Sequence, residues 1–222
     1  MRLLSTFLPF VIAPVSAVTL SFGSLPSAQG WNFVNDGVTE VDNIGLAAGV
    51  LSINTIGAGA SFGYYEYSPP LSTGISYLVF EARLLQNEGS DFPEFGFGFG
   101  VYDSNVAYVV GLGQGYVKAY QGTSAAFDTS VFRTYVLAVN HDLQSYVLSV
   151  DGTPLLNGTP VVSGGNMVAF GDLTSGGNAH GELRFLTYDA TAGLPNAGIP
   201  EPATALLAMS GCLLVAALRR VR

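Results

Sequence analysis

The chain has 222 residues, 49% of them hydrophobic, with 28 glycines, 14 phenylalanines and 11 tyrosines. Its one cysteine, Cys212, lies in an apolar run near the C-terminus, which excludes a disulfide framework and a thiolate metal site. The formal net charge is −8, and between Val18 and Pro202 four basic residues stand against all 16 acidic ones, a net charge of −12 that disfavours nucleic acids and anionic surfaces as partners.

The first 17 residues are predicted to be a signal peptide. Arg2 supplies a minimal positive charge, a mostly apolar stretch follows it, and Val15-Ser16-Ala17 fits a cleavage site of small residues. Cleavage after Ala17 would make Val18 the first residue of the exported chain. Cleavage after Ala28 and an uncleaved N-terminal anchor are the alternatives.

The segment 18–190 is predicted to be one all-β domain. Gly, Ser, Thr, Asn and Asp punctuate short runs of aromatic and β-branched residues, which is typical of strands joined by turns. No stretch combines ten or more residues with apolar spacing of three and four, so almost no helix is expected. Many short strands without intervening helices favour a two-sheet jelly-roll sandwich. The expected strands are 50–55, 61–67, 77–85, 95–102, 107–112, 116–120, 132–140, 145–150, 167–171 and 182–188.

Residues 95–100 read Phe-Gly-Phe-Gly-Phe-Gly. In a strand, successive side chains point to opposite faces, so the three phenylalanines are expected to share the core face. The opposite face would be bare glycine, formed by Gly96, Gly98 and Gly100. Two interpretations stay open: a shallow ligand-binding face, or a structural role in which glycine permits either tight curvature or a loop lying over the sheet.

The dipeptide Asp151-Gly152 stands between two partly apolar runs, 145–150 and 153–156. Type I′ turns need positive φ at both central residues, and Asp-Gly is a favoured pair there. The sequence therefore predicts a β-hairpin with Asp151 and Gly152 at the two central positions of its turn.

The motifs around this hairpin resemble paired strands of concanavalin A-like, laminin-G-like sandwiches. In that family a strand with the form F-x-x-Y, here Phe132 to Tyr135, is followed by one ending in V-D-G, here Val150 to Gly152. Residues 50–55 and 168–172 fit the same layout. The resemblance implies a jelly-roll sandwich with one concave face. Because the family includes lectins, adhesion modules and glycosidases, it leaves the function open.

Little in the sequence supports an enzyme. Glycosidases of the resembled fold place acidic residues at alternate positions of one strand, in an E-x-D-x-x-E or similar pattern, and no such pattern occurs here. Asp91 and Glu94 fall in an expected loop, whereas a retaining pair needs carboxyls about 5 Å apart. His141 is expected in a solvated turn and His180 in a loop. We therefore predict no catalytic residues.

No metal site or cofactor is expected, since two histidines supply too few donors for zinc. Calcium is the one ion that stays open, because it takes oxygen ligands from loops. The residues of the right type are Asp103, Asn105, Asp142 and Asp172, although no EF-hand pattern occurs and such residues also favour turns for local reasons.

The C-terminal segment has three parts. A linker, 191–199, leads to Pro200, Glu201 and Pro202, and an apolar run of 16 residues, 203–218, then precedes Arg219, Arg220 and Arg222. As a transmembrane helix the run would span about 24 Å against a bilayer core of about 30 Å, and arginine side chains that reach the interface cover part of the difference. The arginines are expected on the cytoplasmic side.

This ending resembles a PEP-CTERM sorting signal of Gram-negative bacteria. The resemblance implies an exosortase-type processing enzyme as partner and transient anchoring in the inner membrane. It also implies a final place at the cell surface or outside the cell. A plain C-terminal anchor that nothing cleaves is the alternative.

The leading functional hypothesis is an exported, non-catalytic surface or extracellular-matrix protein that recognises polysaccharide. The PEP-CTERM resemblance favours it, since that sorting system accompanies exopolysaccharide production. The alternatives are a passive structural coat component without a small ligand, and a glycoside hydrolase of the concanavalin A-like fold. The residues expected to contact sugar are Tyr64, Tyr65, Tyr67, Tyr116 and Tyr120.

Overall fold

The computed structural model describes residues 17–69, 74–88, 97–174 and 176–190. Residues 1–16 of the predicted signal peptide, the predicted linker and the predicted sorting signal with its predicted transmembrane helix lie outside these ranges. Within the ranges, no helix combines the length and apolar character needed to cross a membrane.

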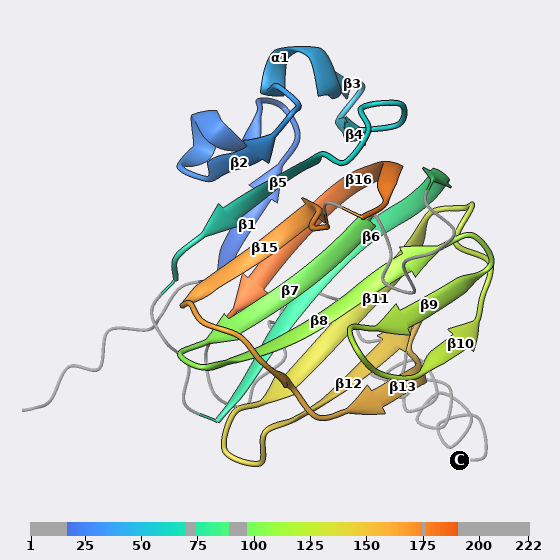
Figure 1. The fold of residues 1–222 in the computed structure, drawn as a ribbon. Helices are drawn as coiled ribbons and strands as arrows, with labels where there is room; N and C mark the ends of the chain where they lie inside the picture. The colour runs from blue at the N-terminus through green and yellow to red at the C-terminus, as the bar shows by residue number, and fades with distance from the viewer. Residues whose placement is uncertain (1–16, 70–73, 89–96, 175, 191–222) are drawn as a thin grey trace, which may run out of the picture.

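The described chain folds into two antiparallel sheets that pack face to face (Figure 1). The layer nearer the viewer in Figure 1 is called the front sheet, and the layer behind it the back sheet. Each sheet contains eight strands in the part of the chain that the structure describes. The predicted all-β, two-sheet architecture is thereby confirmed, and it is consistent with a jelly roll.

The front sheet runs in the order β10 (Ser124–Ala126), β9 (Tyr116–Ala119), β8 (Val106–Gly113), β7 (Phe97–Asp103), β15 (Met167–Asp172), β5 (Phe62–Tyr67) and β2 (Asn32–Asp36), with β14 (Val161–Val162) paired to β8. The back sheet runs in the order β13 (Thr153–Gly158), β12 (Ser145–Val150), β11 (Arg133–Asn140), β6 (Ile75–Glu88), β16 (Asn178–Asp189), β4 (Val50–Asn54) and β3 (Ile44–Ala47), with β1 (Val18–Ser21) paired to β16.

The long strand β16 pairs with two different strands along one of its edges. Its residues 180–183 pair with β4, and its residues 185–188 pair with β1. Its other edge pairs with β6, with a register irregularity between Leu183 and Phe185. Because Val18 stands opposite Tyr188, the start and the end of the described sandwich lie side by side.

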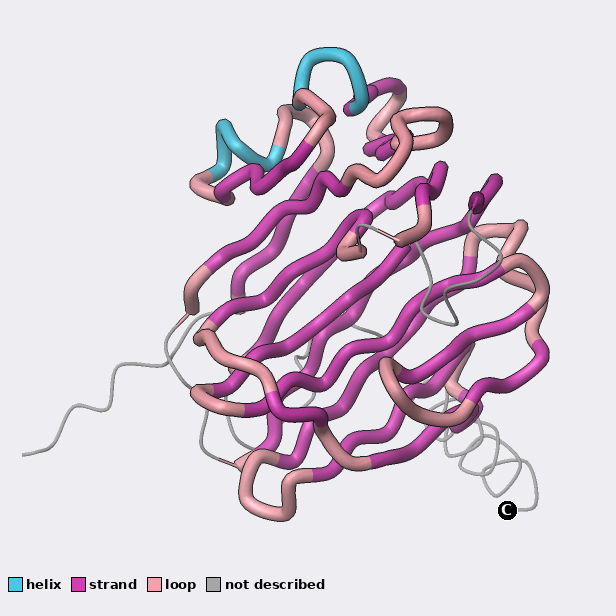
Figure 2. Tube along the Cα trace, in the orientation of Figure 1, coloured by secondary structure: helices cyan, strands magenta, loops and turns pink. Residues whose placement is uncertain are grey.

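Helix is confined to two short segments of the described residues (Figure 2). The helix α1 (Glu40–Asn43) is capped by Thr39, whose side chain accepts a hydrogen bond from the amide of Asp42. The 3₁₀ helix η1 (Pro26–Gln29) ends at Gly30. The expectation of almost no helix is confirmed.

Each of the ten predicted strands has a counterpart in the described ranges, with ends that differ by up to four residues, and residues 95 and 96 of one predicted strand lie outside those ranges. The strand expected at 77–85 extends to Glu88, because its polar end pairs with the start of β16. The prediction missed several strands of two to five residues. These are β1, β2, β3, β10 and β14.

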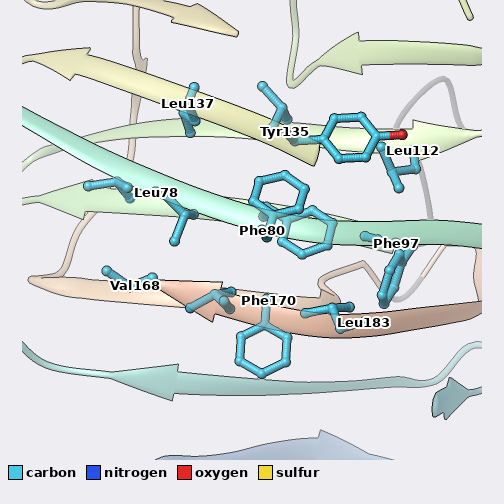
Figure 3. Packing of buried hydrophobic residues seen from close by; sticks show 14 of the residues in the cluster. Leu78, Phe80, Phe97, Leu112, Tyr135, Leu137, Val168, Phe170 and Leu183 are labelled. Atoms are coloured by element: carbon cyan, nitrogen blue, oxygen red, sulfur yellow. The ribbon is translucent and has the colours of Figure 1, made fainter. Parts of the chain in front are cut away.

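The core between the sheets is rich in aromatic rings (Figure 3). Phe99 of the front sheet stacks on Phe80 of the back sheet, with ring centroids 3.7 Å and ring planes 9° apart. Phe80 also stacks on Tyr135 at 5.1 Å, and Phe97 meets Phe99 edge to face. The predicted core face of the Phe-Gly run is therefore confirmed for Phe97 and Phe99, both fully buried, whereas Phe95 lies outside the described residues.

The predicted hairpin is formed by β12 and β13. Asp151 and Gly152 have φ angles of 49° and 79°, and Val150 pairs with Thr153 across the turn. Both central residues have positive φ, as the type I′ turn requires.

Replacing Gly152 with valine is expected to lower the free energy of unfolding by about 1–2 kcal/mol, because a β-branched residue resists positive φ. Urea unfolding followed by circular dichroism measures the change. The matched control is Thr153→Val at the exposed neighbouring position, where a shift below about 0.5 kcal/mol is expected. Equal stability of the two variants would show that the turn does not need positive φ at Gly152.

Candidate functional site

The outer face of the front sheet has a floor of small residues at its centre. Residues paired across antiparallel strands point to the same face, and β8, β7 and β15 place four glycines, one alanine and one valine at two successive levels. The levels are Gly111, Gly98 and Gly171, and then Val109, Gly100 and Ala169. The predicted glycine face is present at Gly98 and Gly100, Gly96 lies outside the described residues, and neighbouring strands extend the face.

Tyrosine rings of the same face lie against this floor. A Cβ atom added to Gly100 would stand 2.8 Å from Cε2 of Tyr102 and 3.0 Å from Cγ2 of Val109. A Cβ atom added to Gly113 would overlap the ring of Tyr116. At these two positions glycine makes room for a tyrosine ring, an arrangement that neither interpretation from the sequence included.

Tyr102 lies at the centre of a small cluster outside the main core. It packs with Tyr120 against the buried side chains of Ala107 and Val109. Burial first, and then Tyr64, Tyr120 and Glu66, raise the pKa of Tyr102 to about 12. The Tyr102 hydroxyl therefore stays protonated through the neutral range and remains a hydrogen-bond donor.

Polar groups surround this cluster on the β5 side. Burial and the carboxylate of Glu66 raise the pKa of Tyr64. The amide nitrogen of Asn32 on β2 donates a hydrogen bond of 3.1 Å to Oε1 of Glu66. We call the set formed by Tyr64, Tyr102, Tyr116, Tyr120 and Glu66 the tyrosine face.

Three of the five tyrosines predicted to contact sugar belong to this face, and two do not. Tyr64 and Tyr65 are neighbours on β5, so they point to opposite sides of the sheet. Tyr65 is fully buried and donates a hydrogen bond to Glu40, and Tyr67 packs against the core beside Trp31. Neither Tyr65 nor Tyr67 is retained as a candidate contact.

Tyr102 is the member of the tyrosine face that the prediction missed. The alternation in β7 places Phe97, Phe99 and Val101 in the core, so that Gly100 and Tyr102 share the outer side. Extending the Phe-Gly alternation by one more step along the strand would have found it.

The described acidic residues of this outer face do not form a retaining glycosidase pair. They are Glu66 on β5 and Asp36 on β2, and Glu66 pairs in register with Asn32. Four residues of strand separate Asn32 from Asp36, a backbone distance of about 13 Å, whereas a retaining pair holds its carboxyls about 5 Å apart. Asp91 and Glu94 lie outside the described residues.

His141 is held inside the protein, so the expectation of a solvated turn is wrong for its side chain. Its ring is 6% exposed, with Nδ1 2.7 Å from Oδ2 of Asp103 and Nε2 2.8 Å from Oγ of Ser76. The turn itself is present at residues 141–144. No local pattern indicates this contact, because Ser76 and Asp103 lie 65 and 38 residues away along the chain.

The connection from Asp103 through His141 to Ser76 resembles the order of groups in a hydrolytic triad. A nucleophile must meet its substrate, yet Ser76 is fully buried, and its hydroxyl also hydrogen-bonds to Tyr188. The edge of Tyr108 packs against the imidazole at 5.8 Å. In this conformation the three groups satisfy one another's hydrogen bonds at the end of the core and are closed to a substrate.

His180 is also placed differently from the prediction. It belongs to β16 rather than to a loop, and its Nε2 lies 2.9 Å from Oγ of Ser52 on the neighbouring strand β4. This contact between neighbouring strands lies on the outer side of the back sheet and gives the imidazole a hydrogen-bond partner there.

The four calcium candidates do not all meet in one site, because Asp172 lies apart from Asp103. Asp103 adjoins Tyr102, which pairs with Met167 at the start of β15, whereas Asp172 stands at the other end of that strand. Asp172 is buried and accepts a hydrogen bond from Thr55. Among the described residues, no three His, Cys, Asp or Glu side chains gather closely enough to hold a metal ion together.

No protein-family model and no curated protein sequence matches the chain. Solved structures do match. One is a sialidase, with a TM-score of 0.54 and 12% identity. The match covers 81% of this chain but only 19% of the length of the sialidase. A prokaryotic beta-1,3-1,4-glucanase (lichenase) from a mouse hindgut metagenome has a TM-score of 0.50 at 14% identity, over 79% of this chain and 100% of its own.

A carbohydrate esterase of the Shiga toxin-encoding bacteriophage phi24B has a TM-score of 0.52 at 12% identity, over 81% of this chain and 99% of its own. At such identities these likenesses carry information about the fold alone. The chain has the two-sheet antiparallel sandwich of these proteins.

Proposed function

We propose that the chain is an exported, non-catalytic surface or extracellular-matrix protein that binds polysaccharide through its tyrosine face. The observation that carries the proposal is the gathering of Tyr64, Tyr102, Tyr120 and Glu66 on one outer face, with Tyr102 seated over Gly100. Aromatic rings offer apolar surface to the faces of sugar rings, while phenol, amide and carboxylate groups bond to sugar hydroxyls.

Two further observations support the proposal. The names of the similar solved structures include a glucanase, a sialidase and a carbohydrate esterase, so the shared sandwich is found in proteins that act on carbohydrates. The spacing of Glu66 and Asp36 supports binding over hydrolysis, because a retaining glycosidase needs its two carboxyls side by side.

Affinity gel electrophoresis of the mature protein through soluble polysaccharides tests the proposal. The protein is expected to be retarded by at least one polysaccharide, and Tyr102→Ala should weaken that binding about tenfold, because it removes the central ring of the face. The affinity of Tyr102→Phe should lie between those of the unaltered protein and Tyr102→Ala, since this variant keeps the ring and loses the hydroxyl.

The matched control is Tyr77→Ala on the back sheet, which should bind as the unaltered protein does. Thermal unfolding of each variant separates lost binding from lost folding. A passive coat component would show no retardation by any polysaccharide, and equal binding by the Tyr102→Ala and unaltered proteins would place the ligand elsewhere.

The proposal includes export and sorting through the two terminal segments, with an exosortase-type enzyme as partner. The position of β1 supports a mature chain that begins at Val18 rather than after Ala28. Leu20 is fully buried, Phe22 is nearly so, and Val18–Ser21 pairs with β16. Loss of these residues would open the core at the edge of the back sheet.

Mass spectrometry of the extracellular protein is expected to find Val18 as the first residue and to find the chain shortened from about Pro202 onward. The unprocessed precursor, made without export, is the control and should retain Arg222. An extracellular form that still ends at Arg222 would contradict the sorting proposal. A first residue after Ala28 would contradict the role of β1 in the mature fold.

A further inference from the structure

The sparse positive charge of the sandwich is distributed unevenly between the two sheets. Between Val18 and Pro202 the basic residues are Arg83, Lys118, Arg133 and Arg184. All three arginines belong to strands of the back sheet, β6, β11 and β16. Only Lys118 lies on a strand of the front sheet.

Each arginine is matched by a carboxylate on its own sheet or turn. Nη2 of Arg83 lies 2.6 Å from Oε2 of Glu182, and Nη1 of Arg184 lies 2.9 Å from Oε1 of Glu81. Nη1 of Arg133 lies 3.0 Å from Oδ2 of Asp151 in the β12–β13 turn. The three guanidinium groups therefore form their ion pairs within the back sheet and its turn, away from the tyrosine face.

Lys118 lies at the far side of the tyrosine face from Glu66. In register it pairs with Gly111, and the same level continues through Gly98 and Gly171 to Tyr64. Four strand spacings separate Lys118 from Tyr64, about 19 Å, which is more than twice the screening length of about 8 Å at physiological ionic strength. Lys118 therefore does little to offset negative charge near Tyr64.

The β5 side of the face is instead acidic. The Glu66 carboxylate accepts a hydrogen bond from the neutral amide of Asn32. Its negative charge contributes to the raised pKa of both Tyr64 and Tyr102. Carboxylate and amide oxygens accept hydrogen bonds from hydroxyl groups, and the protonated phenols donate to them. These groups match the hydroxyls of an uncharged sugar, whereas a sugar carboxylate placed there would meet another carboxylate.

We infer that the ligand of the tyrosine face is a neutral glycan chain, with Glu66 as the acceptor for its hydroxyl groups, and that uronic-acid polysaccharides are disfavoured there. This inference rests on the proposed function and names the substrate class of the same face. The net charge of −12 between Val18 and Pro202 acts in the same direction, because like charges oppose the approach of a polyanion.

The test compares the mature protein on two sets of probes at 0.05 M and about 0.5 M salt. The neutral set is mixed-linkage β-glucan, galactomannan and dextran, and the acidic set is polygalacturonate and alginate without added divalent cations. Binding is expected to at least one neutral probe at least tenfold more tightly than to either acidic probe. Its affinity should change less than about twofold between the two salt concentrations.

Glu66→Gln supplies the second arm. It should weaken neutral binding threefold or more, because an amide is a poorer acceptor than a carboxylate. It should also reduce the discrimination against polygalacturonate. The control is Glu81→Gln on the back sheet, which should change neither the affinity for neutral probes nor the discrimination against polygalacturonate.

The two proposals fail differently. Tighter binding to an acidic probe, weakened by salt, would overturn the neutral-glycan inference and keep polysaccharide binding. Neutral binding that is unchanged by Glu66→Gln would overturn the role of that carboxylate. Binding to none of the probes would contradict the proposed function itself.

Discussion

Replacing Phe99 with alanine is expected to lower the free energy of unfolding by about 3–5 kcal/mol, the range for a large aromatic side chain removed from a core. Phe99 is fully buried and provides the stacked contact between the sheets, with its ring centroid 3.7 Å from that of Phe80. Its neighbours are held by paired strands on both sides, so they can close only part of the cavity.

Urea unfolding of the Phe99→Ala variant measures this loss. The control is Val162→Ala, at an apolar position that is 94% exposed, where a change below about 0.5 kcal/mol is expected. A loss of less than about 1 kcal/mol at Phe99 would show that the stacked pair contributes little to holding the sheets together.

Replacing Asp172 with asparagine is expected to stabilise the protein at pH 8 and to flatten its stability between pH 4 and 7. Asp172 is fully buried at the end of β15. Burial raises its pKa to about 7, although hydrogen bonds from the Thr55 hydroxyl at 2.5 Å and the Thr174 amide at 3.3 Å favour the carboxylate. No lysine or arginine in the described ranges forms an ion pair with it.

The direction of the pH effect follows from proton binding. An unfolded aspartate has a pKa of about 3.9, so between pH 4 and 7 the folded protein holds a proton at Asp172 that the unfolded chain has released. Stability from this group therefore falls as pH rises through that window, by about 1.4 kcal/mol per pH unit and about 4 kcal/mol in all.

Urea unfolding at pH 4, 6 and 8 tests this expectation. Asp172→Asn should be more stable than the unaltered protein by about 2–4 kcal/mol at pH 8, and the advantage should shrink toward pH 4. Asp142→Asn at an exposed turn position is the control for the removal of a charge as such. Parallel pH profiles for the Asp172→Asn and unaltered proteins would contradict the raised pKa.

Local patterns predicted the parts of the fold that depend on neighbouring residues. The Asp151-Gly152 turn was recognisable because positive φ at two successive positions favours that dipeptide. The core face of Phe97 and Phe99 followed from strict alternation. The strand β2 was missed because its sequence, Asn-Phe-Val-Asn-Asp, has turn-forming residues at both ends, and pairing with β5 holds it extended.

The candidate site depends on contacts that the sequence does not display. Alternation along β5 separates Tyr64 from Tyr65, but only the packing of the two sheets decides which of them is buried. The interior position of His141 depends on Ser76 and Asp103, which other strands bring to it. The hydrogen bond to the buried Asp172 likewise comes from Thr55, 117 residues away.

The most direct test of the tyrosine face is hydroxyl-radical footprinting of the mature protein, alone and with a polysaccharide that retards it. Mass spectrometry then measures oxidation at individual tyrosines. We expect the polysaccharide to protect Tyr64, Tyr102 and Tyr120 on the front sheet and to leave the oxidation of Tyr77 on the back sheet unchanged. Protection of Tyr77 without protection of the three front-sheet tyrosines would contradict it.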